Sequence, residues 1–171
     1  GKNHIIDVSF TMFSFVYTTI LFMYFLLARH LNNGVLIVWW IFVTTWLCDT
    51  GAFFIGLRFG RRKLVPNISP HKTIEGSIGG IIFSSLGSFL FTRILLSYVK
   101  PVDALLIGVI VGIFSQIGDL SASLIKRYCK IKDFSNIIPG HGGILDRFDS
   151  ALFSFPVAYY YILFFIQGGG Y

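Results

Sequence analysis

Residues 123–149 read SLIKRYCKIKDFSNIIPGHGGILDRFD and join two long apolar stretches of a 171-residue chain. This segment contains eight charged residues and four Gly or Pro residues. The apolar stretches on either side are each long enough to cross a bilayer as a helix. Charged residues at such a boundary are costly to maintain, which indicates that the segment does more than connect two helices.

The composition of the whole chain is typical of a membrane protein. Hydrophobic residues make up 54% of the sequence and charged residues 13%, whereas soluble domains have about 25% charged residues. Because the bilayer offers no water to backbone polar groups, spanning segments must be helices or closed barrels. The short alternating segments of a barrel are absent from the sequence. The sequence therefore predicts an all-α, polytopic integral membrane protein.

Five apolar segments are candidate transmembrane helices, since about 20 apolar residues cross a bilayer. They are Val8 to Ala28, Gly34 to Leu57, Gly76 to Val99, Val102 to Ile125 and Leu145 to Gln167. We expect residues 1–171 to form a single transmembrane catalytic domain. The sequence begins without Met and soon becomes apolar, so we expect a fragment that lacks N-terminal helices of a longer protein.

Two connections carry most of the basic residues. They hold Arg61, Arg62, Lys63 and Lys72 in one case, and Lys126, Arg127, Lys130 and Lys132 in the other. Five alternating spans place both connections on one side of the membrane, and the positive-inside rule assigns that side to the cytoplasm. This topology accounts for the net charge of +6, and we expect no nucleic-acid partner.

Carboxylates from three predicted helices lie at one depth near the cytoplasmic face. Asp119 lies seven residues before Lys126, which is about 10 Å at 1.5 Å per residue. Asp49 has a similar depth in the second span, and Asp146 and Asp149 open the fifth. Because carboxylates inside a membrane usually mark a functional site, we expect these groups to converge. Such oxygens suit Mg²⁺, which also binds phosphates.

Structural roles for the acids remain open alternatives. Asp146 and Asp149 could cap their helix or interact with its dipole. Asp49 could pair with a basic residue of a neighbouring helix. Asp119 is the strongest candidate ligand, because it is deep and shares a helix face with Ser123.

One loop contains groups that suit a phosphate. Residues 139–143 read PGHGG and precede a predicted helix start. Backbone N–H groups and the helix dipole could receive phosphate oxygens there, although many Gly-rich turns only connect elements. His141 could donate to a phosphate, carry a proton or have no role.

The other basic connection contains residues 69–76, which read SPHKTIEG. The Ser-Pro pair predicts a helix start, with Ser69 as the cap and Pro70 at the first helical position. Lys72 then lies where a compact cation could reach a nucleotide phosphate.

At these residues the chain resembles the phosphatidate cytidylyltransferase family, the CDP-diacylglycerol synthases. The C-terminal signature of that family is matched at Ser123, Lys126, Arg127, Lys132, Asp133, Pro139, His141, Gly142, Gly143, Asp146, Arg147 and Asp149. Residues 49–60, 69–76 and 116–120 also resemble family motifs, so the signature region spans 49–149. His71 stands where a second Lys is common. Family members are usually longer, with additional N-terminal spans.

The resemblance implies an enzyme, a CTP:phosphatidate nucleotidyltransferase. CTP and phosphatidic acid would give CDP-diacylglycerol and pyrophosphate, in phospholipid biosynthesis. The family uses Mg²⁺, forms homodimers and works in the bacterial inner membrane or its organellar equivalents. We expect a multi-pass protein with its active site on the cytoplasmic side.

The resemblance also implies roles for individual residues. Asp119 and Asp146 would hold Mg²⁺, with Asp149 as direct or indirect support, and a second cation could bind there. Phosphate contacts would come from Lys72, Lys126, Arg127, His141 and Arg147, with Ser69 and Ser123 as secondary donors and Asp49, Gly142 and Gly143 as further substrate-binding positions. The catalytic set is then Asp119, Asp146, Asp149 and Lys126.

Three other functions remain as alternatives. A related membrane CDP-lipid synthase with an ether-lipid substrate would keep the same site and change only the apolar groove. A transport protein would place broken helices and acids near the membrane midplane, whereas these acids lie toward one face. An inactive fragment is the third alternative.

Overall fold

The computed structural model describes residues 2–131, 133–135, 143 and 145–168. The elements follow the order α1 (Lys2–Phe15), π-helical η1 (Val16–Ile20), α2 (Leu21–Arg29), α3 (Gly34–Phe59), strands β1 (Lys63–Val65) and β2 (Ser69–Thr73), α4 (Ile74–Leu95), α5 (Pro101–Tyr128), α6 (Leu145–Tyr161) and π-helical η2 (Ile162–Gln167). Among the described residues, five helical stretches are long and apolar enough to cross a membrane: 11–29, 34–59, 74–95, 101–128 and 145–167. Each overlaps a predicted span, so the prediction of an all-α, multi-pass membrane protein is confirmed.

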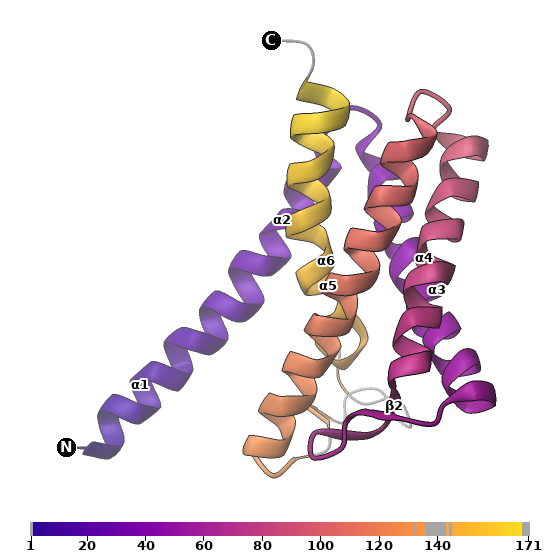
Figure 1. The fold of residues 1–171 in the computed structure, drawn as a ribbon. Coiled ribbons are helices and arrows are strands. Elements are labelled where there is room, and N and C mark those ends of the chain that lie inside the picture. The colour runs from indigo at the N-terminus through magenta and orange to yellow at the C-terminus, as the bar shows by residue number, and fades with distance from the viewer. Residues whose placement is uncertain (1, 132, 136–142, 144, 169–171) are drawn as a thin grey trace.

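The helices α3 to α6 form a bundle whose successive members alternate in direction (Figure 1). The hairpin and the end of α5 lie at one end of this bundle, and the connection between α4 and α5 lies at the other. The Arg127 Nε–H of α5 donates to the backbone carbonyl of Ile68 in the hairpin turn, at 3.4 Å. The two basic connections therefore lie on the same side, as the alternation of spans predicted.

Small residues allow α3, α4 and α5 to approach closely. A Cβ at Gly108 of α5 would lie 2.3 Å from the Cα of Ser85 on α4. One turn along, the Ser88 hydroxyl donates to the backbone carbonyl of Ala104 at 2.5 Å, and the Trp40 Nε1–H of α3 donates to the Ser88 Oγ at 2.9 Å. The hydrophobic effect contributes little to the association of helices in lipid. These interhelical hydrogen bonds and close backbone contacts therefore hold the three helices together.

The first helical stretch has two parts with different surroundings. In Figure 1, α1 diverges from the bundle while α2 rejoins it beside α6. Apolar side chains along α1 are exposed, among them Ile5, Met12 and Phe15. Beyond the π-helical segment η1, α2 packs on α3 and α6, and Ala28 is fully buried there.

The hairpin corrects one prediction from the sequence. Ser69 and Pro70 do not begin a helix, because both lie in β2, which pairs antiparallel with β1. The cap of α4 is Thr73, whose hydroxyl accepts a hydrogen bond from the Gly76 N–H at 3.1 Å. Thr73 satisfies a backbone donor that would otherwise be unpaired at the helix start, so the helix starts four residues later than the Ser-Pro pair suggests.

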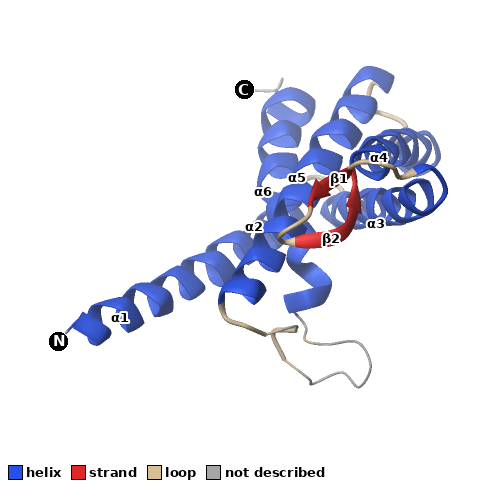
Figure 2. Cartoon of the chain, turned by 60° about the horizontal axis from the view of Figure 1, so that its bottom comes forward, coloured by secondary structure: helices blue, strands red, loops and turns tan. Residues whose placement is uncertain are grey.

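The acidic side chain of Glu75 fixes the hairpin to the start of α4. Its carboxylate accepts hydrogen bonds from the backbone N–H groups of Arg61, at 3.0 Å, and Arg62. Figure 2 shows the resulting hairpin lying across the end of the bundle, next to α3, α4 and α5. The hairpin therefore covers the end at which the predicted carboxylates lie.

Candidate active site

A cavity of about 510 Å³ opens between α3, the hairpin, the start of α4, and α5. Its polar wall includes Asp49, Lys72, Ser77, Gln116 and Asp119, and its apolar wall includes Phe53, Leu57 and Leu64. This volume lies in the usual range of small-molecule pockets, about 300–1,000 Å³. The mixture of apolar surface with a few charged groups is also typical of a ligand site.

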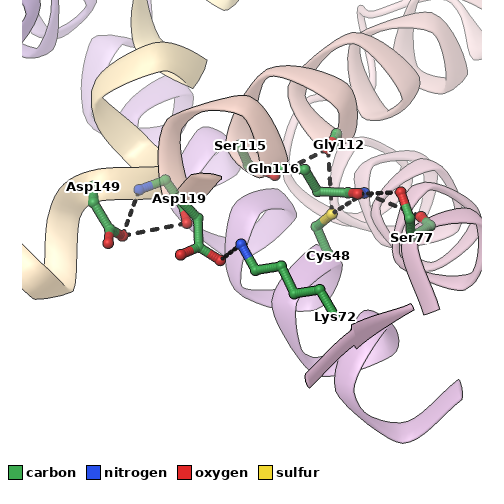
Figure 3. A network of polar contacts seen from close by, with 9 residues as sticks. Cys48, Lys72, Ser77, Gly112, Ser115, Gln116, Asp119 and Asp149 are labelled. Atoms are coloured by element: carbon green, nitrogen blue, oxygen red, sulfur yellow. Dashed lines mark hydrogen bonds and ion pairs between the residues drawn. The ribbon is translucent and has the colours of Figure 1, made fainter. Parts of the chain in front are cut away.

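Lys72 and Asp119 form an ion pair across this cavity wall (Figure 3). Lys72 comes from β2, and Asp119 comes from the C-terminal half of α5. Their side chains are 26% and 32% exposed. The Nζ atom of Lys72 is itself buried and faces the Asp119 carboxylate in this ion pair. Asp119 is therefore the counter-ion that neutralises a largely desolvated ammonium group.

Two further carboxylates lie within electrostatic range of Asp119. Asp49 of α3 lines the same cavity. Asp149 of α6 lies near Asp119, with 7% of its surface exposed. The Asp149 Oδ1 accepts a hydrogen bond from the Ser150 N–H at 2.7 Å. Three helices thus bring three acidic side chains to one region. Their mutual repulsion favours the binding of a cation nearby.

Asp146 lies in a second, adjoining cluster at the start of α6. Its Oδ1 receives the Lys126 ammonium at 2.7 Å, and both side chains are largely buried, with Lys126 14% and Asp146 7% exposed. Its Oδ2 accepts hydrogen bonds from the backbone N–H groups of Phe134 and Gly143, each at 2.9 Å. Asp146 therefore binds backbone groups on both sides of the connection between α5 and α6. Its bond with Gly143, just before α6, is the capping role that the sequence allowed.

The sequence did not nominate one residue of this site, Gln116. It lies one turn before Asp119, and its amide N–H donates to the backbone carbonyl of Ser77 at 3.0 Å and approaches the Cys48 sulfur at 3.6 Å. Its amide oxygen accepts from the Ser77 hydroxyl. These contacts, drawn in Figure 3, tie α3, α4 and α5 together beside the cavity. The available signal was its position in the family motif at 116–120.

The other predicted positions are spread over the same end of the bundle. Arg127 and Arg147 are exposed, and Ser69 and Ser123 are half-buried. Gly143 is buried against Ser135, whose Oγ would lie 2.6 Å from a Cβ placed there. The predicted residues His141 and Gly142 lie outside the described residues.

The predicted Mg²⁺ site depends on acidic side chains from α5 and α6. In the described part of the chain, no group of three or more His, Cys, Asp or Glu side chains is close enough to form a ready-made metal site. Mg²⁺ often binds through only one or two carboxylates, with water and substrate phosphates completing its shell. Each predicted ligand, Asp119 and Asp146, is paired with a lysine ammonium group, so a metal ion at either carboxylate would share it with that lysine or displace the lysine. A Mg²⁺ site here would depend on ligands supplied by water and substrate, and it stays a prediction.

Comparisons with known proteins identify the family of this chain. The cytidylyltransferase family matches residues 1–165 of the chain. The chain is 40% identical over 160 residues to a phosphatidate cytidylyltransferase of Bacillus subtilis, covering 93% of this chain and 60% of that protein. It is 43% identical over 151 residues to the phosphatidate cytidylyltransferase of Staphylococcus haemolyticus, covering 88% of this chain and 57% of that protein. The chain therefore spans about 60% of the length of these relatives, and it belongs to the cytidylyltransferase family.

Proposed function

We propose that the protein containing this chain is a phosphatidate cytidylyltransferase. It would transfer CMP from CTP to phosphatidic acid and release pyrophosphate. The observation that carries the proposal is the Lys72–Asp119 ion pair in the wall of a cavity that also contains Asp49. Similarity to enzymes of that name over most of this chain supports it.

In the proposed reaction, a phosphate oxygen of the lipid attacks the α-phosphorus of CTP. The bond between the α-phosphorus and the bridging oxygen breaks, and pyrophosphate leaves with that oxygen and its electron pair. Such transfers depend mainly on positioning and charge neutralisation. Lys72 would neutralise phosphate charge from the hairpin, and Lys126 from the end of α5.

Asp119 and Asp146 are the proposed Mg²⁺ ligands, with Asp149 as support. Mg²⁺ bound there would neutralise phosphate charge as it develops in the transition state. The ion pairs of these residues with Lys72 and Lys126 mean that an incoming phosphate–metal complex would share or replace each ammonium. The phosphate contacts proposed for Arg127, His141 and Arg147 and the support from Ser69, Ser123, Gly142 and Gly143 belong to the same proposal.

The proposed location is the inner membrane of a bacterium, with the site at the cytoplasmic face. The bacterial relatives support this location, as does the grouping of the basic connections at the end that carries the cavity. A water-soluble nucleotide could reach the site from that side, and the lipid headgroup lies at the same interface. A homodimer is the proposed assembly.

The decisive experiment supplies membranes containing the full-length protein with labelled CTP, phosphatidic acid and Mg²⁺. We expect CDP-lipid formation that is lost in Asp119→Asn and Asp146→Asn. Asp103→Asn is the matched control, because Asp103 lies in the first turn of α5 at the opposite end and hydrogen-bonds Tyr161 at 2.9 Å. Full activity in both test variants would contradict the assigned ligands, and no CDP-lipid from the unmodified protein would contradict the function.

A thermal-shift measurement separates metal binding from turnover. We expect Mg²⁺ with a non-hydrolysable CTP analogue to raise the unfolding temperature of the unmodified protein and of Asp103→Asn. Asp119→Asn should lose that shift. An equal shift in all three proteins would argue against Asp119 as a ligand.

A further inference from the structure

Tyr17 is a buried phenol near the acidic cluster that the proposed mechanism does not use. It lies in η1 and is 7% exposed. Its ring stacks on Phe13, with ring centroids 5.7 Å apart, and contacts Phe153 of α6 at 6.0 Å. Its hydroxyl has no hydrogen-bond partner within the described part of the chain. The Phe153 ring that it contacts lies one turn after Asp149 and 3.2 Å from the position of a Cβ at Gly118, the residue before Asp119, so the phenol packs beside the acidic cluster.

A buried hydroxyl without a partner is costly, at about 1–3 kcal/mol. A phenylalanine would fill the same space between Phe13 and Phe153 without that cost. Native structures usually pair such groups, and an exception calls for an explanation such as a missing ligand. The hydroxyl of Tyr17 is therefore a donor that lacks its acceptor.

The local backbone places this donor at a junction in the fold. Val16–Ile20 is π-helical, and such segments occur frequently at functional sites. On one side of the junction α2 is packed into the bundle, and on the other α1 diverges from it with apolar side chains such as Met12 exposed (Figure 1). Tyr17 thus lies between the acidic cluster and a surface that the acyl chains of a lipid can contact.

We propose that the Tyr17 hydroxyl donates a hydrogen bond to a phosphate oxygen of a substrate bound beside Asp119. This inference rests on the proposed function and adds a binding residue from the first membrane helix. A phosphate bound there would share or take over the ammonium of Lys72, which is paired with Asp119, as in the proposed function. The position of Tyr17 on the lipid side favours the phosphate of phosphatidic acid over that of CTP.

Steady-state kinetics of the full-length protein test the proposal with Tyr17→Phe. This change keeps the ring contacts and removes only the hydroxyl. We expect the KM for phosphatidic acid to rise about tenfold, as for loss of a hydrogen bond to a charged group, with the KM for CTP unchanged. A rise only in the KM for CTP would support the same hydrogen bond and assign it to the nucleotide phosphate. Unchanged values for both substrates would overturn the proposal.

Tyr24→Phe is the matched control. Tyr24 lies two turns along the same helical stretch, and its hydroxyl pairs with that of Tyr160 at 3.0 Å. Removing that hydroxyl tests a general effect of losing a phenol from this helix. We expect both KM values of Tyr24→Phe to match the unmodified protein, and a rise equal to that of Tyr17→Phe would overturn the proposal.

A binding measurement distinguishes this inference from the proposed function. Native mass spectrometry of the purified protein would compare retention of phosphatidic acid with that of diacylglycerol, which lacks the phosphate. We expect Tyr17→Phe to reduce retention of phosphatidic acid about tenfold and to leave that of diacylglycerol unchanged. This result would stand even if the unmodified protein formed no CDP-lipid. Equal retention of phosphatidic acid by both proteins would overturn the inference alone.

Discussion

Lys72 of β2 forms an ion pair with Asp119 of α5, and this contact joins the hairpin to the bundle at the wall of the cavity. The hairpin is held to α4 by Glu75 and to α5 by Arg127. Lys72 is therefore presented by a short, well-anchored element and not by a loose loop. This anchoring reduces the conformational entropy that a long side chain loses when it binds a phosphate.

Replacing Lys72 with Met should lower kcat/KM for CDP-lipid formation by about 100-fold, the usual cost of removing one donor to developing charge. The substitution keeps much of the side-chain volume and removes the ammonium that faces Asp119. The measurement is the initial rate in membranes at matched protein amounts. Lys100→Met removes an exposed positive charge at the opposite end of α5 and should retain activity. Equal rates for the two variants would contradict a phosphate role for Lys72.

The Lys126–Asp146 pair should contribute to stability in addition to any role with substrate. Both side chains are largely buried, and removing one partner of such a pair leaves an uncompensated charge. Lys126→Met and Asp146→Asn should each lower the unfolding temperature of the purified protein. The double variant should lose less unfolding free energy than the sum of the two single losses, since the coupling energy between contacting residues is commonly about 0.5–3 kcal/mol.

The control for this cycle pairs Lys126→Met with Asp103→Asn. Asp103 lies near the other end of α5 and interacts with Tyr161. The loss of unfolding free energy in that double variant should equal the sum of the two single losses. If the Lys126–Asp146 losses also add, the 2.7 Å contact does not couple the two residues in the folded protein.

The spans could be predicted from the sequence, whereas the contacts within the site could not. Apolar length determines a membrane helix because the bilayer excludes unpaired backbone groups. It also gives the depth of Asp49 and Asp119, and these residues do line one cavity. Hydropathy does not give the rotation of each helix about its axis. The partners of Asp119 and Asp146, which are Lys72 and Lys126, therefore emerged only from the packed structure.

The hairpin was missed for a related physical reason. Residues 63–73 include two Pro residues and several polar residues, with no sustained alternation of the kind that predicts a strand. Their pairing depends on Glu75, which binds the backbone of Arg61 and Arg62 from the first turn of α4. Such a tertiary anchor has no local sequence signal. The buried hydroxyl of Tyr17 likewise lay within an apolar span and gave no pattern of its own.

Gly108 should not tolerate even a methyl group. A Cβ there would lie 2.3 Å from the Cα of Ser85 and 2.9 Å from its backbone nitrogen. Because these are backbone atoms, α4 and α5 would have to separate, which would weaken the hydrogen bond from Ser88 to Ala104. Gly108→Ala should lower the unfolding temperature and the yield of folded protein, by an amount typical of overpacking, about 1–3 kcal/mol.

Leu106→Ala is the comparison for Gly108→Ala. Leu106 lies two residues earlier on α5, and 44% of its surface is exposed. Its truncation in the lipid-facing surface should change the unfolding temperature little. A loss equal to that of Gly108→Ala would indicate that the close approach of α4 and α5 does not limit stability.

Thr73 should affect stability through its hydroxyl. It is buried, caps α4 and accepts a hydrogen bond from the Gly76 N–H at 3.1 Å. Thr73→Val keeps the shape of the side chain and removes the acceptor, so the N–H of Gly76 loses its partner. We expect a loss of about 1 kcal/mol, the typical cost of deleting a cap, measured as a lower unfolding temperature. Thr73→Ser keeps the acceptor and should lose much less unfolding free energy.

Because Thr73 follows Lys72 directly and lines the same cavity, Thr73→Val should also lower CDP-lipid formation, whereas Thr73→Ser should retain it. Equal behaviour of the two variants would mean that the methyl group of Thr73, and not its hydroxyl, holds the end of the hairpin in place.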